Sequence, residues 1–202
     1  MTEAMSERPP FDDPIVWFRE AFERARASEP FDPSRAALAS VTPEGLPAVR
    51  FVLVKQVDAT GFAFFTNYRS PKAEQLERLP RAALAFHWAT LDLQFRTHGP
   101  VSRLDAAASD AYFASRPRGS QLAAWASEQS RPIESRAALE ARFADVEARF
   151  AEQQQVERPP FWGGYLLQPE QVEVWRSRPS RLHDRWSFAR HGDTWHCHRL
   201  QP

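Results

Sequence analysis

The apolar positions of the chain first follow a helical period. Between residues 13 and 30, DPIVWFREAFERARASEP, the apolar residues Ile15, Phe18, Phe22 and Ala25 recur three or four positions apart, which places them on one face of a helix. Asp13 can cap this helix, and the proline that follows it suits the first helical position. The pattern therefore predicts a helix that buries one face.

The pattern then becomes extended over residues 36–67. The turn sequences TPEG and DATG separate apolar, β-branched stretches, which predicts three antiparallel strands. A short helix follows in SPKAEQLERLP, with Ser70 as its cap, Pro71 in its first turn and Pro80 after its end. Residues 81–88 and 91–104 favour two more strands.

A helical period returns over residues 105–117, 119–130 and 135–155, and residues 161–200 again favour strands, with RHGD as a hairpin turn. Strands at both ends with helices inserted between them predict an α+β fold whose sheet closes as a barrel, because closure removes exposed edges. We predict a single domain over residues 13–202, preceded by a mobile N-terminal segment, residues 1–12.

Composition limits the class of protein. The 202 residues carry 26 basic and 26 acidic side chains, which argues against a dedicated nucleic-acid binder. The only cysteine, Cys197, excludes an intrachain disulfide and a cysteine-based zinc site, and it suits a reducing compartment. The start of the chain lacks a signal pattern, and no apolar run approaches the roughly 18 residues that a membrane helix needs. We expect a soluble cytoplasmic protein without a membrane partner.

Several familiar chemistries are absent from the sequence. There is no glycine-rich phosphate loop and no G-x-S-x-G elbow, and the histidines lack a convincing metal-ligand spacing, so we predict no metal site. Cations are nevertheless concentrated in WRSRPSRLHDRWSF, residues 175–188, which holds four arginines. This stretch is either a solvated, charge-laced hairpin or part of a pocket for an anionic ligand with a flat ring.

Two further cationic motifs are ambiguous by themselves. SRPRGSQ gathers Arg116, Arg118 and Ser120 between two helices, as a phosphate site requires, although a solvated loop is the more common explanation. VRFVLVK places Arg50 and Lys55 at the ends of an apolar strand, where their spacing directs them to opposite faces. A charged residue in such a strand more often marks an exposed edge.

Taken together and in order, five stretches resemble the pyridoxamine/pyridoxine 5′-phosphate oxidase family. They are RFVLVK, FFTNYRSPKAEQL, YFASRPRGSQLAAWASEQS, FWGGY and VEVWRSRPSRLHDR, and the resemblance extends from about Asp13 to Pro202. It implies a homodimer of FMN-binding split β-barrels, with flanking and inserted helices, that binds FMN at the subunit interface. It also implies oxidation of pyridoxamine and pyridoxine 5′-phosphate to pyridoxal 5′-phosphate, with hydride transfer to the flavin and reduction of O2 to H2O2.

The resemblance also assigns roles to individual residues. The residues implied for FMN are Arg50, Phe51, Val52, Leu53, Val54, Lys55, Phe65, Thr66, Lys72, Gln94, Gln129, Ser130, Trp175 and Arg185. Those implied for the substrate are Lys55, Tyr112, Arg116, Ser120, Arg181, Leu182 and His183, of which Arg181 and His183 lie at the reacting ring and are the catalytic candidates.

The chain departs from the family pattern in two places. Pro71 stands where many members have an arginine, which removes one cation expected near the flavin phosphate. The N-terminal segment is short and lacks the basic, tyrosine-containing stretch that members often carry. Two other functions remain open: a phenazine-type oxidase acting on a larger, non-phosphorylated ring system, and a module that binds FMN or pyridoxal phosphate without turnover.

Overall fold

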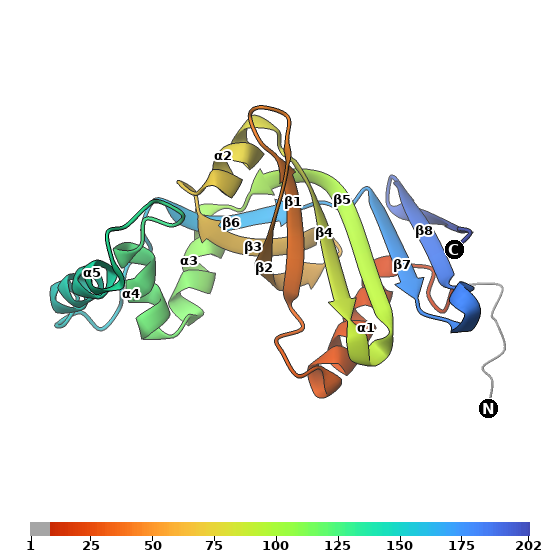
Figure 1. Ribbon diagram of the computed structural model, residues 1–202, viewed down its shortest axis with the longest axis horizontal. Helices are drawn as coiled ribbons and strands as arrows, with labels where there is room; N and C mark the ends of the chain where they lie inside the picture. The colour runs from red at the N-terminus through yellow and green to blue at the C-terminus, as the bar shows by residue number, and fades with distance from the viewer. Residues whose placement is uncertain (1–8) are drawn as a thin grey trace.

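The computed structural model describes residues 9–202 (Figure 1). Residues 1–8, most of the predicted mobile segment, lie outside the described residues. The strands are β1 (Arg35–Val41), β2 (Pro47–Asp58), β3 (Gly61–Asn67), β4 (Arg81–Trp88), β5 (Leu93–Arg103), β6 (Trp162–Leu167), β7 (Gln171–Arg176), β8 (Asp184–His191) and β9 (Thr194–Arg199). The helices are α1 (Pro14–Ser28), α2 (Pro71–Arg78), α3 (Ala106–Ser115), α4 (Arg118–Ala126) and α5 (Arg136–Arg149), with short 3-10 turns η1 (Ala89–Leu91) and η2 (Pro179–Arg181).

Six of the strands form a closed antiparallel barrel, which confirms the predicted α+β fold. Their order is β4-β1-β2-β3-β6-β5, and β4 pairs with β5 to complete the ring. Strand β5 also pairs with β7, so β7, β8 and β9 extend the sheet beyond the barrel. Figure 1 shows this extension at one end of the molecule and helices α3, α4 and α5 at the other.

Helix α1 supplies the centre of the core, as its apolar spacing predicts. Its N-cap Asp13 accepts a hydrogen bond from the backbone N–H of Ile15 at 2.7 Å. Phe18 is buried against three barrel aromatics, with ring centroids 5.1 Å from Phe62, 4.7 Å from Phe86 and 5.3 Å from Phe95. These edge-to-face contacts fix the helix across the barrel.

Helix α2 begins after Ser70, as predicted, but the serine side chain does not cap it. The hydroxyl of Ser70 donates instead to the backbone carbonyl of Asn67 at 2.7 Å and accepts from the ammonium of Lys72 at 3.2 Å. The side chain is therefore used to organise the loop before the helix and to hold a cation in the first helical turn.

Strand β2 carries an exposed apolar face on the outside of the barrel. Val49 and Phe51 are 70% and 72% exposed, and Leu53 lies on the same face. In the sheet register Val49 and Phe51 lie opposite Ala39 and Ala37 of β1, so small side chains continue the surface. A continuous apolar surface of this kind is typical of a protein–protein interface.

Strand alternation separates the two predicted cations of β2. Arg50 lies on the same face of β2 as the buried Val54, whereas Lys55 lies on the exposed face, which confirms that the two cations point to opposite faces.

No helix among the described residues is long and apolar enough to cross a membrane.

Candidate active site

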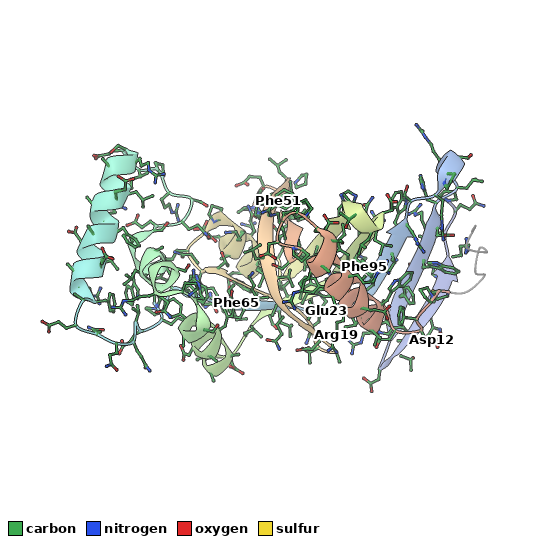
Figure 2. All side chains as sticks on the ribbon, turned by 90° about the horizontal axis from the view of Figure 1, so that it is seen from below. Asp12, Arg19, Glu23, Phe51, Phe65 and Phe95 are labelled. Carbon is green, nitrogen blue, oxygen red and sulfur yellow. The ribbon has the colours of Figure 1, made fainter. Side chains whose placement is uncertain are left out.

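A cavity of about 460 Å³ opens between the barrel wall and helices α3 and α4. Figure 2 shows Phe65 on the side of the barrel that faces these helices. The cavity gathers many of the residues that the sequence assigns to one site. Its lining comprises Arg35, Phe51, Val52, Leu53, Lys55, Phe65, Thr66, Lys72, Tyr112, Arg116, Pro117, Ser120, Gln129 and Trp162.

Lys72 is the buried cation of this cavity. Its ammonium donates to Thr66 Oγ1 at 3.1 Å, Ser70 Oγ at 3.2 Å and Gln129 Oε1 at 2.7 Å, all of which are neutral acceptors. Burial, and then repulsion from Arg50, lower the pKa of Lys72 to about 8. A cation that is taken out of water without an acidic partner favours an anionic ligand, and a phosphate fits this requirement.

Arg50 approaches the same region from β2. One guanidinium nitrogen donates to Gln75 Oε1 at 2.8 Å, and the other donates to the hydroxyl of Ser40. Burial lowers the pKa of Arg50, so its charged form is also disfavoured in this environment. Lys72 and Arg50 therefore form one cationic centre held by uncharged groups.

A second cationic centre lies on α3 and the loop that follows it. The guanidinium of Arg116 stacks 4.6 Å from the ring centroid of Trp162, and its buried Nη1 has no hydrogen-bond partner. The rings of Phe65 and Tyr112 stack at 3.9 Å beside it. Burial raises the pKa of Tyr112, which keeps its hydroxyl as a donor. An unpartnered, buried guanidinium nitrogen that borders a cavity is a further indication of an anionic ligand.

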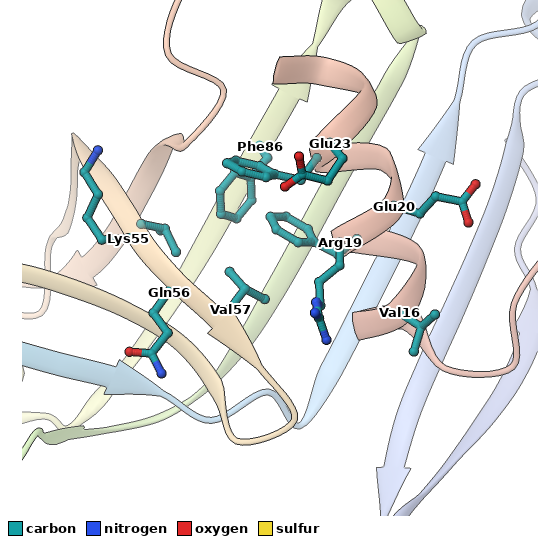
Figure 3. A pocket seen from close by; sticks show the side chains of 11 residues that line it. Val16, Arg19, Glu20, Glu23, Lys55, Gln56, Val57 and Phe86 are labelled. Atoms are coloured by element: carbon teal, nitrogen blue, oxygen red, sulfur yellow. The ribbon is translucent and has the colours of Figure 1, made fainter. Parts of the chain in front are cut away.

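Lys55 completes this side of the cavity. Its ammonium pairs with Asp32 at 3.2 Å and contacts Ser34 Oγ at 3.3 Å. The residue also borders a second cavity of about 450 Å³ between α1 and β2, which has an apolar floor that includes Phe86 and Val57. In Figure 3 the Lys55 ammonium points away from that floor, which leaves it available to the first cavity.

The remaining predicted residues form a separate cluster on the sheet extension. Gln94 of β5 lies opposite Trp175 of β7, which lies opposite Arg185 of β8, so the three follow one row across the strands. The ring of His183 lies 4.5 Å from that of Trp175, and its Nδ1 accepts the backbone N–H of Arg178 at 3.2 Å.

The loop before β8 presents Arg181 and Leu182 to solvent in an unusual backbone conformation. Ser180 and Arg181 have positive φ values of 57° and 60°, which side-chain-bearing residues rarely adopt. Asp184 secures the end of the loop through ion pairs with Arg178 at 2.6 Å and Arg199 at 2.9 Å. Backbone strain of this kind is common where a side chain has to be aimed at a ligand.

One chain therefore divides the predicted site into two clusters. The first surrounds the cavity beside α3 and α4, and the second lies on β5, β7 and β8, with the barrel between them (Figure 1). Three predicted residues lie outside both the cavity lining and the sheet-extension cluster. Val54 is buried in the core, Ser130 has a positive φ of 68°, and Arg50 lies behind the lining, where it bonds Ser40 and Gln75.

Three cavity residues were missed by the sequence assignment. Trp162 and Pro117 lie inside the quoted motifs FWGGY and SRPRGSQ, so motif membership could have found them. Arg35 lies outside every motif, and only the pairing of β1 with β2, which sets it opposite Leu53, brings it to the cavity.

The buried ammonium predicts a pH dependence of phosphate binding. The free protein holds the pKa of Lys72 near 8, below the ordinary value of 10.5, and a bound phosphate would raise it. The affinity for FMN is therefore expected to be highest below pH 8 and to fall, by up to about tenfold per pH unit, as the pH rises above 8. Fluorescence titration of apoprotein with FMN between pH 7 and 9.5 measures this. Lys72→Gln should bind FMN more weakly at pH 7, and its affinity should not change with pH in this range. An equal fall in affinity with pH in both proteins would contradict the assignment of Lys72 to the phosphate.

Comparison with known proteins defines first the fold class and then the family. A pyridoxamine 5′-phosphate oxidase-related, FMN-binding protein from Nostoc punctiforme has the same split-barrel fold, with a TM-score of 0.75 at 23% identity, over 98% of this chain and all of that one. The family model "Pyridoxamine 5′-phosphate oxidase" matches residues 22–150, and that of the "Pyridoxine 5′-phosphate oxidase C-terminal dimerisation region" matches residues 162–202. The chain belongs to the pyridoxamine 5′-phosphate oxidase family of FMN-dependent oxidoreductases.

Curated relatives match over nearly the whole chain. A pyridoxine/pyridoxamine 5′-phosphate oxidase from Anaeromyxobacter dehalogenans is 55% identical, over 94% of this chain and 96% of its own length. One from Brucella canis is 47% identical over the full length of both chains. Among solved structures, PhzG from Burkholderia lata in complex with tetrahydrophenazine-1-carboxylic acid has a TM-score of 0.88 at 28% identity, over 96% of this chain and 94% of its own.

Proposed function

We propose that this protein is a homodimeric, cytoplasmic oxidase that converts pyridoxamine and pyridoxine 5′-phosphate to pyridoxal 5′-phosphate, using FMN and O2 and releasing H2O2. The observation that carries the proposal is a single cavity with two cationic centres, one at Lys72 and one at Arg116. Two centres suit two phosphates, one on the cofactor and one on the substrate. The relatives named for this activity support the same conclusion.

The cofactor phosphate fits the centre formed by Lys72 and Arg50. The neutral acceptors around Lys72 leave its positive charge uncompensated, and the first turn of α2 adds the favourable field of a helix N-terminus. Lys72 and Arg50 would therefore hold FMN at its phosphate, despite Pro71 in place of a further arginine. When bound, FMN supplies the two-electron chemistry that takes hydride from the substrate and passes electrons to O2.

The substrate phosphate fits the second centre. The cavity wall brings Lys55, Tyr112, Arg116 and Ser120 together, although they come from a strand, two helices and the loop between them. This set combines two cations with two hydroxyls, which are the donors that a phosphate accepts. On substrate binding, the Lys55 ammonium would give up part of its contact with Asp32 and contact the substrate phosphate instead.

The ring end of the site requires the second cluster, which we assign to the partner subunit of a homodimer. The outer face that exposes Phe51 is continuous across β1, β4, β5 and β7 with the row Gln94–Trp175–Arg185, by the sheet register. The matched dimerisation region covers β6 to β9. A two-fold related copy on this face would unite each cavity with the partner's cluster.

In such a dimer Arg181 and His183 face the substrate ring. The planar guanidinium of Arg181 stacks on a pyridine and holds it in place for hydride transfer. His183 accepts a backbone N–H at Nδ1, so its Nε2 is the nitrogen left to orient the substrate or to exchange a proton with it.

Arg116→Ala is expected to raise the KM for pyridoxine 5′-phosphate by roughly 10- to 150-fold, the value of a lost charge-assisted hydrogen bond. FMN content should change little, because Lys72 and Arg50 form a separate centre. Steady-state kinetics and the flavin absorbance measure the two quantities. Arg118→Ala is the matched control, since Arg118 donates to the backbone carbonyl of Phe150 at 2.7 Å and is outside the cavity lining. An unchanged KM in Arg116→Ala would remove that residue from the substrate site.

The likeness to PhzG keeps a phenazine-type oxidase as the second candidate. The two functions differ in their need for a substrate phosphate. Peroxide release under air should therefore be measured with pyridoxine 5′-phosphate, with unphosphorylated pyridoxine and with a reduced phenazine carboxylic acid. Turnover of the phosphorylated substrate alone is expected. Turnover of the phenazine alone would support the second candidate, and FMN binding without any turnover would indicate a binding module.

A further inference from the structure

Arg185, the cation of the sheet extension assigned to FMN, has all three guanidinium nitrogens engaged within the chain. Nε and Nη2 both contact Oε1 of Glu173, at 3.0 Å and 2.9 Å. Nη1 donates to the backbone carbonyl of Gln201 at 2.9 Å. The orientation of this guanidinium is therefore set by the protein before any ligand arrives.

Glu173 is unusual for its position on the sheet. It belongs to the outer face of β7 yet is only 9% exposed, because two arginines cover its carboxylate. Arg96 of β5, which lies opposite Glu173 in the register, binds the other carboxylate oxygen. Removing this carboxylate would leave two guanidiniums without their acidic partner.

The position of Glu173 relative to the second cluster suggests what its role is. Trp175 lies two residues further along β7, on the same face, and pairs with Gln94 on one side and Arg185 on the other. Glu173 thus lies in the row next to the predicted flavin contacts and bonds directly to one of them. Glu173 is not among the residues that the sequence assigns to the cofactor or the substrate.

We propose that Glu173 is a positioning residue for FMN binding, which acts by holding Arg185 in the orientation that the flavin requires. The inference rests on the proposed function, because it takes Arg185 to be a flavin contact. Glu173 has a second effect through charge. The group formed by Arg96, Glu173 and Arg185 carries one net positive charge, and neutralising Glu173 would leave two beside the flavin.

A double-mutant cycle tests whether Glu173 acts through Arg185. Arg185→Ala should weaken FMN binding by roughly tenfold or more, the value of a hydrogen bond to a charged group. Glu173→Ala should weaken it to a similar extent. The double variant should bind no worse than Arg185→Ala alone, because the effect of Glu173 is lost with its partner. Losses that multiply in the double variant would overturn the proposal.

Glu173→Gln separates charge from orientation and protects the test against misfolding. Glutamine keeps the volume and one acceptor oxygen, and a cooperative thermal transition of the apoprotein shows that the variant is folded. The flavin reduction potential should become more positive, because the added positive charge stabilises the anionic reduced flavin. A potential equal to that of wild type would contradict the charge effect.

Glu170→Ala is the matched control. Glu170 pairs with Arg81 just before β7, away from the Gln94–Trp175–Arg185 row, so this substitution should leave the affinity for FMN unchanged.

Failure of the wild type to bind FMN would reject the proposed function. Wild-type binding that is weakened in Arg185→Ala but not in Glu173→Ala rejects the positioning role alone.

Discussion

Arg181→Lys is expected to lower kcat/KM for pyridoxine 5′-phosphate by about 10- to 100-fold, although the substitution keeps the positive charge. Lysine lacks the planar fork that stacks on a pyridine ring. The backbone conformation of this loop fixes the direction of the side chain. Ser180 and Arg181 both have positive φ, and Asp184 holds the loop through two ion pairs. Arg181→Lys should therefore lower the rate of turnover without lowering the stability of the fold.

The measurement is peroxide release with both B6 phosphates, together with FMN content. FMN content should remain near that of wild type, because the residue faces substrate. Arg190→Lys is the control: Arg190 lies near the far end of β8, where its guanidinium is 5.8 Å from the centroid of the Trp195 ring of β9. His183→Asn should be milder than Arg181→Lys if the histidine only orients the substrate. Wild-type rates in Arg181→Lys would show that RLHDR is not a clamp on the ring.

Phe51→Asp is expected to convert the protein to a monomer with almost no bound FMN. Phe51 is the centre of the exposed apolar face of β2, and an unpaired carboxylate buried in a dimer interface costs several kcal/mol. Because the predicted flavin contacts are divided between the cavity and the sheet extension, a monomer would retain only part of its binding site. Phe51 itself also lines the cavity, so the change in oligomeric state is the result that tests the interface.

Sedimentation velocity and the flavin spectrum test this expectation together. Leu139→Asp is the control, since Leu139 is an exposed apolar residue on α5, at the end of the molecule remote from β7 and β8 (Figure 1). It should remain dimeric and yellow. A Phe51→Asp protein that stays dimeric, or a monomer with full FMN occupancy, would contradict the assignment of this face.

Much of the fold follows from local sequence patterns. The apolar spacing of residues 14–28 yields α1, and the turn sequences TPEG and DATG yield the β1–β2–β3 meander. The pairing of β5 with three strands does not follow, because single-sequence periodicity contains no information on which strands are neighbours. The left-handed Ser180 and Arg181 also lack a local signal, since glycine would be the usual residue there.

The candidate site shows the same division. Arg116 and Lys72 were found through motif resemblance, and the structure brings both to one cavity. The ion pair between Glu173 and Arg185 depends on the β7–β8 register, which no residue pattern specifies. The sequence also does not predict that the site residues form two separate clusters within one chain, because their separation depends on how the barrel closes.

The central claim is that each active site combines the cavity of one subunit with the sheet extension of its partner. Subunit complementation tests it most directly. Arg116→Ala damages the cavity and Arg181→Ala damages the extension, so each homodimer has only damaged sites. After the two chains are mixed and reassociated, one site of every heterodimer contains both wild-type residues. Random pairing should restore about one quarter of wild-type peroxide release. Activity no higher than the mean of the two homodimers would show that both clusters serve a site within one chain.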